Sequence, residues 1–137
     1  REVQRLGLVA LGDSISRLMP LIRQIGGSNS GMTMFTDLPL PMIPAFLEAY
    51  PLVSLVDALD WPDYLVFDLP LYRLPELKDI LNLPDGTDLP CRAQVLITTP
   101  IPCVGLAHCG ACAVPARRGW KLACEDGPVF DLNQLKW

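Results

Sequence analysis

Four of the five cysteines in this chain lie within 22 residues near its C-terminal end, at positions 103, 109, 112 and 124. Their spacing is C-x5-C-x2-C-x11-C, and thiolates at such short intervals can converge on one metal ion or one inorganic cluster. Gly105 and Gly110 allow the intervening loop to bend around a compact core without the steric cost of a Cβ. The pattern therefore predicts a thiolate metal site.

The spacing alone leaves the occupant of this site open. Four thiolates suit a structural zinc ion, and they also suit an iron–sulfur cluster, whose plant-type C-x4-C-x2-C run is one residue shorter in its first gap. A third possibility is a redox pair of Cys109 and Cys112, although this pair does not open a helix after a strand. His108 is the chain's only histidine, and because a Rieske-type centre needs two, we expect it to be an exposed loop residue or a hydrogen-bond donor to a ligand.

Apolar runs alternate with helical patterns in front of the cysteines. Strands are predicted at 6–11, 31–36, 52–59, 64–67 and 93–98, with a short helix as the alternative for 52–59. Helices are predicted at 15–25, 44–50 and 76–83, the first with either a late start or a kink at Pro20. Alternation of this kind predicts an α/β fold with a mainly parallel, doubly wound, Rossmann-like sheet.

Two further patterns organise the chain. Asp37-Leu-Pro-Leu40 recurs 31 residues later as Asp68-Leu-Pro-Leu71, the length of one strand–helix unit, which marks Asp37 and Asp68 as turn or cap residues. Near the C-terminal end, 120–124 and 128–130 are predicted to form a hairpin around a turn at 125–127. We therefore expect an α/β lobe over residues 1–99 and a small cluster-binding lobe over residues 100–137.

Composition excludes several classes of protein. A net charge of −4 over 137 residues argues against nucleic-acid binding, and no apolar run is long enough for a membrane span. No signal peptide is visible and four of five cysteines cluster, which favours the reducing cytoplasm over a secreted disulfide framework. Cys91 is expected to be a buried structural thiol. Because the chain opens at Arg1 without Met, we expect that a segment precedes it.

The cysteine region resembles a known family. The runs Pro102-Cys103, Cys109-Gly-Ala-Cys112 and Lys121–Phe130 are similar to the C-terminal [2Fe–2S] domain of the electron-transfer subunit of heterodimeric, NAD-dependent dihydroorotate dehydrogenase. The ending Cys124-Glu-Asp-Gly-Pro-Val-Phe130 is its most specific part. The preceding ~100 residues resemble the nucleotide-binding lobe of the same ferredoxin-reductase-like family.

This resemblance implies a cofactor, a partner and a ligand set. In that family an NADH-reduced FAD passes single electrons through the cluster to the FMN of a catalytic partner subunit. Carried over to this chain, the four ligands of the [2Fe–2S] cluster are Cys103, Cys109, Cys112 and Cys124. The function implied is electron transfer in dihydroorotate oxidation, a step of pyrimidine biosynthesis. The chain has no Ser–His–Asp set or phosphate loop, and we expect no acid–base catalytic residues of its own.

The chain also departs from the family. The glycine-rich turn against which pyrophosphate packs is reduced here to Gly12, and Asp13 would place a carboxylate beside the phosphates. The family's Cys-Gly-Pro turn near the nicotinamide reads Asp68-Leu69-Pro70, and the FAD-binding barrel is absent from this chain. We therefore expect FAD only in an intact protein, weak or no NAD binding, and a lobe that serves as a scaffold for the cluster.

Other functions stay open on the sequence. A related ferredoxin–NAD(P)H or sulfide reductase subunit would share this architecture, and a zinc-stapled scaffold would have no redox role. Arg117 and Arg118 are expected near the cluster, where they would raise its potential, dock an acidic partner or lie in a solvated turn. Trp120 and Trp137 are expected either at a subunit interface or in the core under the cluster lobe.

Overall fold

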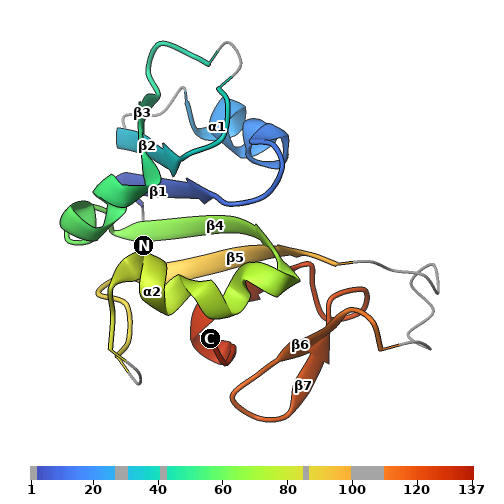
Figure 1. Ribbon diagram of the computed structural model, residues 1–137. Helices are drawn as coiled ribbons and strands as arrows, with labels where there is room; N and C mark the ends of the chain where they lie inside the picture. The colour runs from blue at the N-terminus through green and yellow to red at the C-terminus, as the bar shows by residue number, and fades with distance from the viewer. Residues whose placement is uncertain (1–2, 27–30, 41–42, 85–86, 100–109) are drawn as a thin grey trace.

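The computed structural model describes residues 3–26, 31–40, 43–84, 87–99 and 110–137. Its centre is a six-stranded sheet of strand order β3-β2-β1-β4-β5-β8 (Figure 1). The strands are β1 (Arg5–Ala10), β2 (Gly31–Thr36), β3 (Glu48–Tyr50), β4 (Tyr64–Pro70), β5 (Arg92–Thr98) and β8 (Val129–Asp131). All neighbours pair in parallel except β5 and β8. The predicted mainly parallel α/β fold is confirmed.

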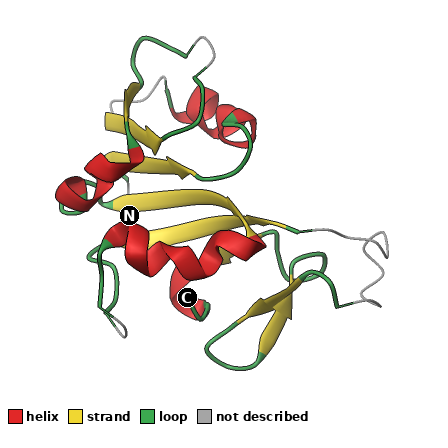
Figure 2. Ribbon diagram, viewed as in Figure 1, coloured by secondary structure: helices red, strands yellow, loops and turns green. Residues whose placement is uncertain are grey.

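The sheet carries helices on both faces (Figure 2). Successive side chains of a strand point to opposite faces, and β1 accordingly contributes Leu8 to one apolar cluster and Val9 to the other. The first cluster includes the helical segments η1 (Ser16–Leu18) and α1 (Met19–Ile25). The second packs against η2 (Leu52–Ala58), η3 (Leu71–Glu76) and α2 (Leu77–Leu81). Because both faces are covered, β1 and β2 are buried along nearly their whole length.

Several predicted elements need correction. Pro20 lies in the first turn of α1, so the late helix start is confirmed. The helix predicted at 44–50 is wrong, because β3 forms there and pairs with Thr33–Phe35 of β2; the ring of Tyr50 stacks on that of Phe35. Residues 52–59 form the short helical alternative, as the 3-10 segment η2, and not a strand.

The predicted C-terminal hairpin is also wrong. The strand β7 (Trp120–Leu122) pairs with β6 (Ala113–Pro115), whereas β8 pairs antiparallel with β5 of the main sheet. The side chain of Asp126 accepts the N–H of Leu122 at 2.9 Å and closes a turn at the end of β7. The chain then runs away from β7, and Phe130 is buried opposite Val95. The C-terminal region therefore supplies a strand to the main sheet, while the division into lobes 1–99 and 100–137 stays a prediction.

Among the described helices, none is both long and apolar enough to cross a membrane.

Candidate metal centre

Two of the four predicted ligands lie together at one end of the β6–β7 pair. Cys112 directly precedes β6 and Cys124 follows β7 by two residues. The antiparallel register pairs Ala113 with Leu122, and the N–H of Ala123 donates to the carbonyl of Cys112 at 3.0 Å. The two Sγ atoms consequently lie 3.3 Å apart, with Cys112 buried and Cys124 half-buried.

This sulfur pair suits a thiolate-bound metal. Two thiolates on one tetrahedral metal with bonds of about 2.3 Å lie roughly 3.8 Å apart, close to the 3.3 Å between Cys112 and Cys124. The pKa of the Cys112 thiol is lowered, first by hydrogen bonding from the backbone at Cys124 and then by the Cys124 side chain. A lowered pKa favours the thiolate, which is the form that binds a metal. The donor set therefore fits the cofactor that the sequence predicts.

The remaining predicted ligands, Cys103 and Cys109, lie outside the described residues, as does His108. Within the part of the chain that is described, no group of three His, Cys, Asp or Glu side chains is placed to hold a metal ion. One further residue borders the cysteine segment. Thr99, directly after β5, has a buried hydroxyl with no hydrogen-bond partner among the described residues. An isolated threonine after a strand carries no signal in the sequence, so Thr99 could not be predicted.

Gly110 shapes the approach to Cys112. Its φ of +70° lies in the left-handed region, and its carbonyl accepts the N–H of Ala113 at 3.1 Å. Gly119, in the turn between β6 and β7, has a similar φ of +79°, and at both positions no atom of the described residues lies within 4 Å of an added Cβ. A side chain at either glycine would thus meet the same kind of backbone strain without a clash.

We predict that Gly110→Ala and Gly119→Ala each lower the free energy of unfolding by about 1 kcal/mol, because the Cβ of alanine is strained in the left-handed conformation. Only Gly110→Ala should also lower the metal content of the purified protein, because only that turn positions Cys112. Urea unfolding and metal analysis of the two variants, prepared in parallel, check this. Equal metal loss in both would show that the turn at Gly110 has no particular role in the site.

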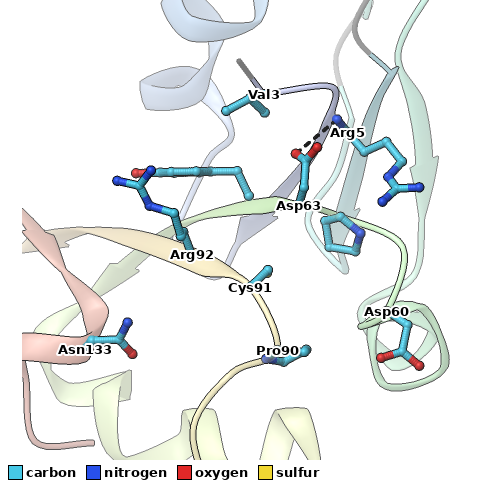
Figure 3. Close-up of a pocket in the computed structure, with 10 residues that line it drawn as sticks. Val3, Arg5, Asp60, Asp63, Pro90, Cys91, Arg92 and Asn133 are labelled. Atoms are coloured by element: carbon cyan, nitrogen blue, oxygen red, sulfur yellow. Dashed lines mark hydrogen bonds between the residues drawn. The ribbon is translucent and has the colours of Figure 1, made fainter. Parts of the chain in front are cut away.

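Cys91 lies away from the sulfur pair. It lines a pocket of about 500 Å³ beside the amino ends of β1, β4 and β5, together with Arg5, Asp63 and Arg92 (Figure 3). The sequence predicts that Cys91 is a buried structural thiol, and the structure shows it partly buried. Its pKa is raised, first by burial and then by the charge of Asp63. Its surroundings therefore favour the protonated thiol, whereas those of Cys112 favour the thiolate.

Asp68 is not the turn or cap residue that the repeat predicted. It lies within β4 with a fully buried side chain, and both of its carboxylate oxygens accept from Nε of Arg17, at 3.1 and 3.3 Å. Burial raises the pKa of Asp68, and the hydrogen bond and charge of Arg17 partly offset that rise. Asp37 lies in a bend directly after β2, and its carboxylate accepts the N–H of Leu52, the first residue of η2, at 3.1 Å.

Two arginines enclose the turn after β1. A Cβ at Gly12 would lie 2.7 Å from Nη2 of Arg17, so the guanidinium sits directly against this glycine. Nη1 of Arg73 donates to the carbonyl of Leu11 at 2.9 Å. The strand order reverses between β1 and β4, and doubly wound sheets bind dinucleotides beyond the carboxyl ends of the strands at such a point. In this chain protein side chains pack there.

Comparison with known proteins agrees with this geometry. Residues 104–136, which include Cys112 and Cys124, match the family model for the iron–sulfur cluster binding domain of dihydroorotate dehydrogenase B. No curated protein matches the chain by sequence. A solved structure of the NADH-dependent reduced ferredoxin–NADP oxidoreductase, described for flavin-based electron bifurcation, is 22% identical with a TM-score of 0.64. The alignment covers 97% of this chain and 54% of that chain, so this chain spans about half of its length.

These findings confirm the resemblance stated from the sequence, by family model over the C-terminal segment and by structure for the fold. The family match supports an iron–sulfur cluster as the cofactor of residues 104–136, and the solved structure supports the α/β fold.

Proposed function

We propose that this chain carries single electrons through a [2Fe–2S] cluster, from an FAD to the FMN of a catalytic partner subunit, as in dihydroorotate oxidation in the cytoplasm. The observation that carries the proposal is the 3.3 Å sulfur pair of Cys112 and Cys124, which lies within the segment that matches the cluster-binding family. The FAD would belong to a domain outside this chain.

The proposed ligands are Cys103, Cys109, Cys112 and Cys124. The β6–β7 pair holds two of these sulfurs in place, because its register fixes the ends from which both cysteines extend. Hydrogen bonding at Cys124 favours the thiolate of Cys112. When bound, a four-thiolate [2Fe–2S] cluster supplies one-electron transfer at a potential set by its hydrogen bonds, charge and exposure.

We further propose that the α/β lobe serves as a scaffold and does not bind NADH tightly. The guanidinium of Arg17 lies against Gly12 and forms an ion pair with Asp68. It therefore blocks the close approach to the backbone that a pyrophosphate needs. The expected result of a calorimetric titration with NADH is no binding in the micromolar range. Binding at micromolar concentration or tighter would contradict the scaffold role.

The test of the proposed function begins with anaerobically purified protein. Visible absorption bleached by dithionite, a rhombic EPR signal after reduction, and about two iron atoms per chain would support the cluster. Reoxidation of the reduced chain by a purified FMN-containing dihydroorotate dehydrogenase subunit would support the partner. A colourless protein with one zinc per chain would instead identify the zinc-stapled scaffold.

A second candidate is a subunit of a related ferredoxin–NAD(P)H or sulfide reductase. The observation that favours it is the fold shared with the ferredoxin–NADP oxidoreductase chain. Reoxidation by a ferredoxin, with no reaction toward the FMN subunit, would select this candidate.

A further inference from the structure

A groove of about 920 Å³ separates α2 from the β6–β7 pair. Its lining includes two tryptophans and three basic residues, namely Lys78, Arg117, Trp120, Lys136 and Trp137. We call this set the basic groove. Trp137 is partly covered, since Nζ of Lys78 lies 4.4 Å from its ring centroid. Trp120, in contrast, is 70% exposed, so the core role considered for it from the sequence is wrong.

The charge around the basic groove is opposite to that of the whole chain. A neighbouring cavity of about 340 Å³ shares Arg117 and adds Arg118 and Lys121. The two linings together hold five of the chain's eleven basic residues and, in Asp79, one of its fifteen acidic residues. Arg117 is also paired with exposed Asp88 at 2.9 Å, so five basic and two acidic side chains lie at this face. This face is therefore positive on a chain of net charge −4.

The basic groove is also close to the sulfur pair. The β6–β7 register pairs Ala113 with Leu122 next to the cysteines, and Pro115 with Trp120 at the other end. At about 3.3 Å per residue, Trp120 lies on the order of 10 Å along the strands from that end. Figure 1 shows β6 and β7 projecting from the main sheet, where a second protein could reach them.

We propose that the basic groove docks an acidic surface of the protein with which this chain exchanges electrons. Trp120 is the anchor, because exposed tryptophans that become buried carry a large share of binding energy at interfaces. The basic residues Lys78, Arg118 and Lys136 face carboxylates of the partner, which speeds association and sets orientation. This proposal rests on the proposed electron-transfer function and adds to it the docking surface and the chemistry of the partner.

The test measures binding of the cluster-loaded chain to the purified FMN-containing dihydroorotate dehydrogenase subunit by calorimetry, at low and at physiological salt. Trp120→Ala is expected to weaken binding by more than about tenfold at both salt concentrations. Lys136→Glu is expected to weaken it by a similar factor at low salt and less at physiological salt, because salt screens charges. Iron content and unfolding midpoint should equal those of the wild type.

Matched controls lie away from the groove, one on the edge strand β3 and one on α1, which covers the other face of the sheet. Tyr50→Ala removes a partly exposed aromatic ring from β3, and Arg23→Glu reverses an exposed charge on α1; both should bind within about twofold of wild type. If the wild type binds and the two groove variants bind equally well, the docking proposal is overturned while the proposed function stands.

Failure of the wild type to bind the FMN subunit would count against the proposed function. In that case a second probe tests the docking proposal separately. A short peptide of Asp and Glu around one Phe should then shift the NMR signal of the Trp120 indole, whereas a Lys version should not. No shift with the acidic peptide would overturn the docking proposal. Dimerisation of the wild type that Trp120→Ala abolishes would assign the groove to a second copy and would overturn it as well.

Discussion

Replacing Cys112 or Cys124 with serine is expected to remove nearly all iron and all visible absorption from the purified protein. The two sulfurs lie 3.3 Å apart, so with the proposed ligand set the loss of one thiolate leaves the cluster without one of its four ligands. Iron and sulfide analysis with absorption spectra of anaerobically prepared variants measures this effect. Each variant should still show the far-ultraviolet circular dichroism of an α/β fold, since the main sheet does not depend on the sulfur pair.

Cys91→Ser is the matched control. Cys91 lines a separate pocket at the amino ends of the strands and has a raised pKa, so its loss should leave the iron content at the wild-type level. Iron retained in Cys112→Ser, or iron lost equally in Cys91→Ser, would contradict the assignment of Cys112 as a ligand.

Arg17→Met is expected to lower the free energy of unfolding at pH 7 by about 1–3 kcal/mol. The side chain of Asp68 is fully buried and accepts from Arg17 through both oxygens, so the substitution leaves a buried carboxylate without its partner. The expected loss is smaller than the loss for a fully buried ion pair, because the side chain of Arg17 is 40% exposed. Urea unfolding of the variant and the wild type measures the difference.

This loss should depend on pH with a definite sign. The pKa of Asp68 in the folded chain is raised above the ordinary 3.8. Between these two values the folded state binds more protons than the unfolded state, so this group makes stability fall as pH rises. Arg17 lowers the pKa of Asp68, so without Arg17 the decrease in stability with rising pH should continue to higher pH. The variant should therefore approach the wild type near about pH 4 and diverge from it toward pH 7.

The double variant Arg17→Met with Asp68→Asn checks the cause. The double variant has no carboxylate at this position. Its free energy of unfolding, compared with that of the wild type, should therefore not decrease between pH 4 and pH 7 as that of the single variant does. A single variant whose deficit is the same at both pH values would show that lost packing of Arg17, and not the buried charge, sets the effect.

The sequence by itself determined the features that depend on local pattern. The apolar runs at 6–11 and 31–36 predicted strands, and β1 and β2 are these strands. Pro20 predicted a late helix start or a kink, because proline is tolerated only in the first turn, and α1 shows the late start. The spacing of the cysteines predicted a thiolate site and, through the resemblance, its iron–sulfur cofactor.

Only the tertiary structure decided the features that depend on distant partners. The strand at 129–131 could pair with the neighbouring β7 or with β5, and burial of Phe130 opposite Val95 selects β5. Asp68 and Arg17 are 51 residues apart in sequence, so no local pattern could show that a buried carboxylate meets a guanidinium over Gly12. The exposure of Trp120 likewise follows from the packing of whole elements. Local propensity acts over a few residues, whereas pairing and burial are settled by the free energy of the complete fold.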